Sequence, residues 1–292
     1  MKKQNEDPTK PCNRIVRNFC LTITQNFQGY LVGKGITYSA ASDNDITALL
    51  DCLNANDIEN SDSVWLKNAL VSGVAYQLCY VNENGDKCFR NLDSSSCFPI
   101  YSADLDEKLL YFVSYTPIID WTREDWATSY QVSVYDDKYI YTYTCDSSFN
   151  NLIPSAEPQE HYFGEVPVAV FELNDDRRSV FEPIISLQDA YNELLSDEVD
   201  DFSAFVDAYL VLTNVTADEE DLAAMKQSRT LLLDQDATAS YLTKSISDTQ
   251  VENMLTNLRA SIHTVSNSPD FSSEEFNQGV SSGIALQYKL LG

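Results

Sequence analysis

The stretch that decides the fold runs from Ser179 to Leu212 and reads SVFEPIISLQDAYNELLSDEVDDFSAFVDAYLVL. It contains eight acidic residues and neither Lys nor Arg. At 100° per residue, its acidic and apolar side chains fall on opposite sides of a helix, which we expect to run from Glu182 to Asp207 over roughly 38 Å. The acids within about 80° of one another are Glu182, Asp189, Glu193, Asp197, Asp200 and Asp207. The apolar side carries Ile184, Tyr191, Leu194, Leu195, Phe202, Phe205, Val206 and Tyr209.

The acidic side of this helix needs support from outside the helix. Like charges four residues apart, such as Asp189 and Glu193, destabilise an isolated helix by about 0.2–0.5 kcal/mol per pair. No basic residue within the stretch offsets this cost. Two interpretations follow: a solvated face of an acidic protein, or the lining of an electronegative passage through which a polyanion moves without binding.

A second one-sided helix follows after an insertion. We expect it to begin at Asp248 and to end at Asn267–Pro269. Its apolar stripe comprises Val251, Leu255, Leu258, Ile262 and Val265. Residues 213–246 between the two helices are predicted to form a small α/β insertion, with a helix seeded by Asp218–Asp221 and strands at Thr230–Leu233 and Ser240–Thr243. Two long helices thus bracket a short insertion.

The chain before these helices is predicted to hold helices followed by an antiparallel sheet, so the fold class is α+β. Helices are expected at Ile15–Gln28, Asp45–Cys52 and Val64–Ser72, with a short strand at Tyr30–Tyr38. From Val74 the period changes to two, and turn residues mark hairpins. The expected strands are Val74–Val81 with Lys87–Leu92, Tyr130–Tyr135 with Tyr139–Thr144, and Val168–Leu173.

Composition excludes several classes of function. With 292 residues, of which 43% are apolar, the chain is long enough to build a folded core. Its net charge of −26 argues against binding nucleic acid by neutralising phosphates. The sequence has no run of about 18 apolar residues and no secretion signal at its start, so we expect a soluble, cytoplasmic chain.

Motifs for catalysis and metal binding are missing from the sequence. The seven cysteines form no CxxC pair, there are only two histidines, and no phosphate-binding loop, dinucleotide fingerprint, HExxH or GxSxG occurs. We therefore expect no catalytic residues, no metal and no cofactor. The alternative is an acidic, β-rich carbohydrate hydrolase or binding module. It would use Asp120, Glu124 and Asp125 beside Trp121 and Trp126, or the shared face of Tyr139, Tyr141 and Tyr143, although a solvated loop and a half-buried sheet face are the commoner interpretations.

Three stretches together resemble the portal proteins of tailed bacteriophages, in particular those of siphophages from Gram-positive hosts. They are Asn18–Tyr38 with YLVGKGITY, Phe163–Leu212 with FGEVPVAVFE and FEPIISLQDAYN, and Ser281–Leu286, SSGIAL. The resemblance implies a portal protomer with a β-rich wing, a two-helix stem and a small α/β clip. In these terms residues 1–177 are the wing, 178–212 the first stem helix, 213–246 the clip, 247–266 the second stem helix, 267–281 the tunnel loop, and 282–292 the truncated start of the next wing helix, without the crown that follows in the family.

The resemblance also implies a function and partners. Portal subunits form a ring, usually of twelve, at one capsid vertex of the virion, after assembly in the bacterial host cytoplasm. Double-stranded DNA passes through the ring in packaging and ejection without sequence-specific binding. The implied partners are the terminase large subunit, which carries the ATPase, a head-completion adaptor, and the scaffolding and capsid proteins. The six stem acids named above would line the channel, Asp218, Glu219, Glu220 and Asp221 would make the clip contacts, and Asn267, Ser268, Asp270, Glu274, Glu275, Asn277 and Gln278 would belong to the tunnel loop.

Overall fold

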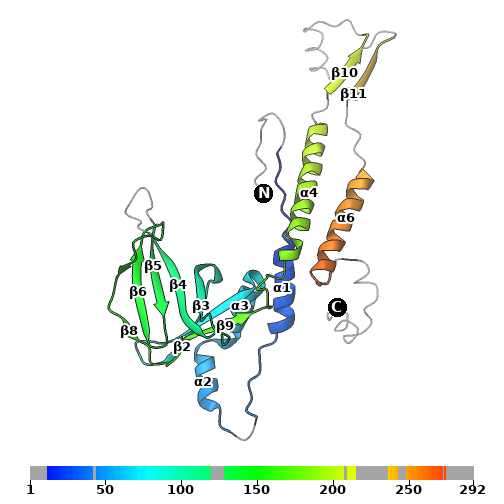
Figure 1. Ribbon diagram of the computed structural model, residues 1–292. Helices are drawn as coiled ribbons and strands as arrows, with labels where there is room; N and C mark the ends of the chain where they lie inside the picture. Colours follow the sequence, from blue (N-terminus) through cyan, green and yellow to red (C-terminus); the bar gives the residue numbers. More distant parts are fainter. Residues whose placement is uncertain are drawn as a thin grey trace. The chain divides into compact units, whose positions relative to one another are not determined.

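The computed structural model describes residues 12–41, 44–119, 128–206, 209–214, 236–242, 248–271 and 273 (Figure 1). The chain divides into two compact units. We call Cys20–Pro183 the sheet unit, and Met1–Phe19 together with Ile184–Gly292 the helix unit. Within the described ranges, no helix is both long and apolar enough to cross a membrane.

Three helices come first: α1 (Phe19–Val32), α2 (Thr47–Ala55) and α3 (Ile58–Ser72). All three were expected, but the bounds of the first were wrong, because residues 12–18 are not helical and α1 continues past Gln28. The third helix begins at Ile58, six residues before the expected Val64. The strand predicted at Tyr30–Tyr38 is also wrong. A short apolar run cannot be told from the last turn of a helix by periodicity alone, and here Tyr30–Val32 completes α1 before Gly33, whose amide donates to the carbonyl of Gly29.

A three-stranded antiparallel sheet follows α3. Its order is β2 (Lys87–Leu92), β1 (Val74–Val81), β9 (Val168–Glu172), and α3 packs against β1. The predicted hairpin of β1 and β2 is confirmed at both strands. Gly73 joins α3 to β1 with φ +78°, a left-handed conformation that ends α3 and that favours glycine.

A second, six-stranded sheet confirms the predicted antiparallel meander. Its strands are β3 (Cys97–Tyr101), β4 (Leu109–Ile119), β5 (Thr128–Tyr135), β6 (Tyr139–Cys145), β7 (Ile153–Pro154) and β8 (Gln159–Glu160). The order is β3-β4-β5-β6-β7, with β8 also paired to β6. A 3-10 turn, η1 (Ser94–Ser96), leads into β3, and the Asp93 carboxylate caps it by accepting from the Ser95 amide.

The core of the sheet unit joins residues from both sheets. Phe112 of β4 is completely buried, with its ring centroid 5.2 Å from Tyr76 of β1 and 6.2 Å from Tyr135 of β5. Cys97 and Val166 complete this buried cluster. Burial raises the pKa of the Cys97 thiol and of the Tyr76 hydroxyl, each to about 12.

The described part of the helix unit contains two helices and an antiparallel pair of strands: α4 (Ile185–Val206), β10 (Tyr209–Thr213), β11 (Thr238–Leu242) and α6 (Asp248–Val265). The 3-10 turn η2 (Glu182–Ile184) precedes α4. The first long helix was expected over Glu182–Asp207; its start needs correction, because Glu182–Ile184 form the 3-10 turn and α4 begins at Ile185, and its last residue is Val206. The apolar run at Tyr209–Leu212 pairs antiparallel with β11, and this pairing fixes it as a strand. The helix predicted at Asp218–Asp221 and the strand predicted at Thr230–Leu233 lie outside the described residues.

Candidate functional site on the acidic helix

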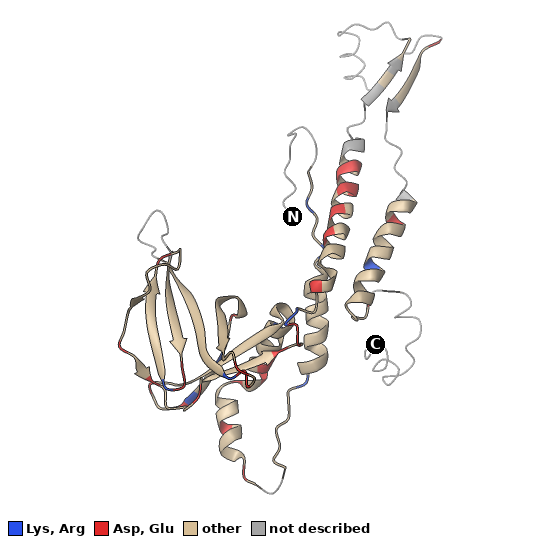
Figure 2. Ribbon diagram, in the orientation of Figure 1, with Lys and Arg blue, Asp and Glu red and all other residues tan. Residues whose placement is uncertain are grey.

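Helix α4 presents a row of exposed carboxylates. Asp189, Glu193 and Asp197 are exposed and four residues apart, so they follow one side of the helix over about 12 Å. Figure 2 shows these and the other acids of α4 in red, on a helix that contains no Lys or Arg. Glu198 and Asp201 are half-buried on other sides of the helix.

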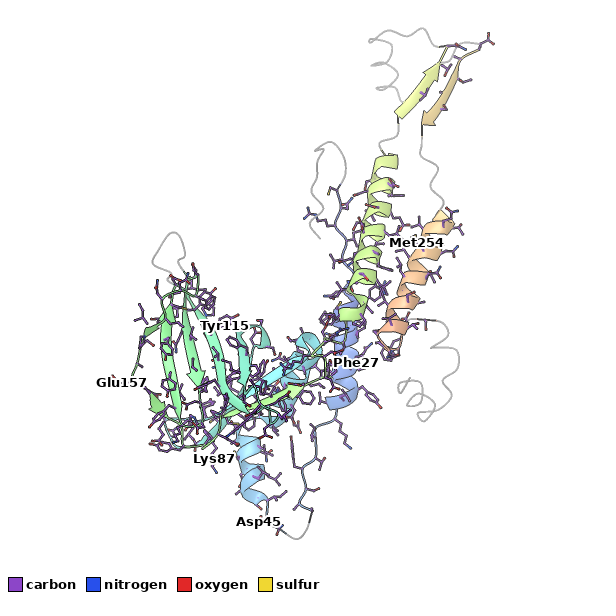
Figure 3. The ribbon with its side chains drawn as sticks, viewed as in Figure 1. Phe27, Asp45, Lys87, Tyr115, Glu157 and Met254 are labelled. Atoms are coloured by element: carbon purple, nitrogen blue, oxygen red, sulfur yellow. The ribbon has the colours of Figure 1, made fainter. Side chains whose placement is uncertain are left out.

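The apolar side of α4 packs against α6 (Figure 3). Tyr191 of α4 and Ile262 of α6 are buried. Val251, Leu255 and Leu258 of the predicted α6 stripe are half-buried, and so are Leu194 and Leu195 of α4. The predicted stripes therefore form the helix pair along most of their length.

Two members of the predicted apolar stripes are exposed instead. Phe202 is 68% exposed in the last turn of α4, and Val265 is 47% exposed at the last residue of α6. α4 has 22 residues and α6 has 18, so α4 is longer by about 6 Å, and in Figure 1 its last turn reaches past the start of α6. Helical periodicity assigns a side chain to a stripe but does not show where the partner helix ends.

The chain that precedes α1 lies along the polar side of α4. Four main-chain N–H groups, at alternate residues, donate to four α4 side chains, at every fourth residue. We call these contacts the α4 ladder. Its rungs are Asn13 N to Asp200 Oδ1 (2.6 Å), Ile15 N to Ser196 Oγ (3.1 Å), Arg17 N to Asn192 Oδ1 (2.9 Å) and Phe19 N to Gln188 Oε1 (3.0 Å).

The ladder separates Asp200 from the exposed acids with which the sequence pattern grouped it. The Asp200 carboxylate is half-buried and accepts from both the main-chain N–H and the side-chain amide of Asn13, the latter at 2.8 Å. The other acceptors, Gln188, Asn192 and Ser196, were missed by the sequence analysis. The signal was present in the sequence, since these residues and Asp200 form an uninterrupted row of side-chain acceptors at four-residue spacing.

The end of α6 holds the first residues of the predicted tunnel loop. Asn267 has φ +50°, and the amides of Asn267 and Ser268 donate to the carbonyls of Thr264 and His263, which is the Schellman pattern of a helix C-terminus. Ser268 is buried, and its carbonyl lies 3.2 Å from His263 Nδ1. Asp270 then turns back onto α6.

Asp270 forms a two-point ion pair with Arg259 of α6. Arg259 Nη2 lies 2.7 Å from Asp270 Oδ1, and Nε lies 2.7 Å from Oδ2. The side chains are 27% and 19% exposed, and His263 Nε2 is 3.9 Å from the same carboxylate. The ion pair thus fixes where residues 267–270 leave the helix.

Other predicted site residues fall elsewhere. Glu182 is exposed in η2 and does not belong to α4. Asp207, the four clip acids, and Glu274, Glu275, Asn277 and Gln278 of the tunnel loop lie outside the described residues, as do Asp120, Glu124 and Asp125. Among the residues that are described, no cluster of three or more potential metal ligands occurs.

The tyrosine face of β6 is half-buried, as the commoner interpretation had it. Tyr141 and Tyr143 are half-buried, and Tyr139 is 38% exposed. The Tyr141 hydroxyl donates to the Asp136 carboxylate at 3.0 Å, and that carboxylate also accepts from the amides of Lys138 and Tyr139. These contacts stabilise the β5–β6 turn.

Comparisons with known proteins bear on the whole chain. Residues 1–292 match the family model described as phage portal protein, SPP1 Gp6-like. The chain is 24% identical over 288 residues to the portal protein of Bacillus phage SPP1, in an alignment that covers 92% of this chain. It spans 56% of the length of that relative.

Proposed function

The chain belongs to the SPP1 Gp6-like family of phage portal proteins, and we propose that it is a ring subunit of the portal vertex, whose channel passes double-stranded DNA. The observation that carries the proposal is the exposed row of Asp189, Glu193 and Asp197 on a helix without basic residues. In the proposed ring, this row faces the DNA. The family is structural and not enzymatic, and no observation favours the carbohydrate hydrolase or binding module.

The charge of α4 suits a passage better than a binding site. Each phosphate that a Lys or Arg neutralises releases counterions and steepens salt-dependent binding, which would hold DNA that has to move. Carboxylates repel the phosphates instead, within a screening length of about 8–10 Å at physiological salt. A ring of such rows would keep a duplex centred and mobile.

The remaining parts of the proposal follow the family. The subunits form a ring of twelve at the capsid vertex of the virion, built in the host cytoplasm. The clip acids, Asp218–Asp221, contact the terminase large subunit and later the head-completion adaptor, while residues 1–177 face scaffolding and capsid proteins. The tunnel loop, residues 267–281, begins at the turn that Asp270 ties to Arg259.

The test uses rings of the full-length protein in a packaging reaction with the cognate terminase. Electron microscopy first establishes that annular particles form. The α4 variant combines Asp189→Asn, Glu193→Gln and Asp197→Asn, and we expect it to slow DNA translocation because retention by the channel increases. The effect should be larger at low ionic strength, where screening is weaker.

A matched control carries the same three charge changes elsewhere. Glu83→Gln, Asp106→Asn and Asp137→Asn remove three exposed acids from turns of the sheet unit. This control should translocate DNA like the unmodified ring at every salt concentration. Equal effects of the two variants, or an unchanged rate for the α4 variant at low salt, would contradict the proposal.

A further inference from the structure

We propose that one side of α4 is a docking site for an extended polypeptide chain, and that residues 13–19 of the same chain occupy it. The site is the row Gln188, Asn192, Ser196 and Asp200, whose side-chain oxygens accept the four rungs of the α4 ladder. This inference goes beyond the proposed function and does not depend on it.

The spacing of every second residue in segment 13–19 matches the spacing of every fourth residue on α4. Two residues of an extended chain advance about 6.6 Å, and four residues of a helix advance about 6.0 Å. Over the three intervals from Asn13 to Phe19 the mismatch grows to only about 2 Å. An extended segment antiparallel to α4 can therefore present every second N–H to every fourth helical side chain along the whole ladder.

The docking site forms hydrogen bonds with a main-chain carbonyl group of the segment as well as with its N–H groups. Gln188 accepts from the Phe19 amide through Oε1 and donates to the Arg17 carbonyl through Nε2. Ser196 Oγ accepts from the Ile15 amide at 3.1 Å and donates its own proton to the Asn192 carbonyl of α4 at 2.6 Å. Gln188 thus pairs with the segment as a neighbouring strand would, while Ser196 only accepts from it, and both side chains are nearly buried.

The exposure of the segment follows the same alternation. Asn13 and Ile15 are half-buried and Phe19 is buried, whereas Arg14, Val16 and Asn18 are exposed. Arg17 is the exception, because its main chain forms a rung while its guanidinium lies over the Phe19 ring, 5.2 Å from the centroid. This alternation in side-chain exposure is the pattern of a segment that is covered along one side.

Phe19 anchors one end of the ladder. Its ring centroid lies 5.0 Å from that of Tyr191 on α4 and 5.8 Å from that of His263 on α6, both edge to face. The anchor fixes the register, since a shift of the segment by one residue would take Phe19 out of this contact and turn every second N–H away from α4.

Proline substitution tests the register, because proline removes one main-chain donor. Arg17→Pro deletes the rung to Asn192, and Val16→Pro, at an exposed neighbour outside the ladder, is its matched control. Arg17→Ala separates loss of the side chain from loss of the N–H. The readout is hydrogen exchange at single-residue resolution of the remaining rung amides, Asn13, Ile15 and Phe19, in the full chain.

We expect Arg17→Pro to speed exchange of these amides by roughly two- to tenfold, the effect of losing one net hydrogen bond. Val16→Pro and Arg17→Ala should stay within about twofold of the unmodified chain. Asn192→Ala, which leaves the segment intact, should reproduce the effect of Arg17→Pro, and the double variant should add little to either. The inference is overturned if the two proline variants behave alike, or if the rung amides of the unmodified chain exchange at the rate of an unfolded peptide. Neither result bears on whether rings form, so the proposed function is judged separately.

Discussion

The ion pair at the end of α6 allows a quantitative prediction. Asp270→Asn preserves the shape of the side chain but removes its charge and turns an amide N–H₂ toward the Arg259 guanidinium, which is itself only a donor. The substitution therefore keeps one of the two contacts, through the remaining side-chain oxygen, without its negative charge, and replaces the other contact by a donor facing a donor. It also leaves the Arg259 charge, 27% exposed, without this carboxylate.

The size of the effect follows from the two contacts of 2.7 Å and the partial burial. Hydrogen bonds to charged groups contribute about 1.5–3 kcal/mol when buried, and exposed ion pairs about 0–1 kcal/mol. A pair with 27% and 19% exposure lies between these limits, so we expect a loss of about 2 kcal/mol. In hydrogen exchange of the last two turns of α6, this corresponds to an increase of about 30-fold.

Glu252→Gln is the matched control, because it removes the charge of an exposed acid from the same helix. We expect it to change exchange by less than about twofold. Trp65, Trp121 and Trp126 all belong to the sheet unit, so the urea midpoint measured by tryptophan fluorescence should stay the same for both variants. An increase below threefold for Asp270→Asn, or an effect as large for Glu252→Gln, would refute the reasoning.

Three further predictions concern the sheet unit, and the urea midpoint measured by tryptophan fluorescence checks each of them. Phe112→Ala should lower the free energy of unfolding by about 3–5 kcal/mol because Phe112 is completely buried, while Phe98→Ala, 48% exposed on the next strand, should lower it by less than about 1 kcal/mol. Gly73→Ala should destabilise more than Gly85→Ala: both glycines have positive φ, but a Cβ at Gly73 would lie 2.0 Å from the Arg177 carbonyl oxygen, whereas at Gly85 it would have no atom within 4 Å. The free energy of unfolding should fall as the pH rises from about 9 toward 12. The Cys97 thiol loses its proton near pH 9 in the unfolded chain, but in the folded chain its pKa is about 12 and the proton is retained. Cys97→Ser should therefore reduce this dependence on pH.

Periodicity and turn signals predicted two hairpins and two apolar helix stripes. The β1–β2 hairpin and the β5–β6 hairpin were anticipated because a turn signal and a change of period coincide there. The apolar stripes of α4 and α6 were also identified, since each helix buries one side against the other.

Two of the errors arose where a distant segment decides the structure. Tyr209–Leu212 continues the apolar pattern of α4 in sequence, but β11, more than 25 residues later, pairs with it. Asp200 shares the angular sector of the exposed acids, but Asn13 binds it from the other end of the chain. A helical wheel shows which side chains share a side and contains no information on what covers that side.

The acid-rich helix α4 is stabilised from within the chain. The pairs of like-charged neighbours on α4 are Asp189–Glu193, Glu193–Asp197 and Asp197–Asp201 at four residues, and Asp197–Asp200 and Glu198–Asp201 at three. At about 0.2–0.5 kcal/mol each, these five pairs oppose the helix by about 1–2.5 kcal/mol. The four rungs of the α4 ladder, at about 0.5–1.5 kcal/mol each, contribute about 2–6 kcal/mol.

Because the α4 ladder stabilises the helix, the acidic content of α4 alone does not require a ring. The sequence suggested that only something outside the helix could tolerate so many acids, and the ladder supplies that support from residues 13–19 without a second subunit. The stability of α4 is therefore no argument for assembly. What remains is the exposure of Asp189, Glu193 and Asp197 and the match to the portal family over the whole chain. These two observations support the proposal that the row faces a polyanion that must pass without being held.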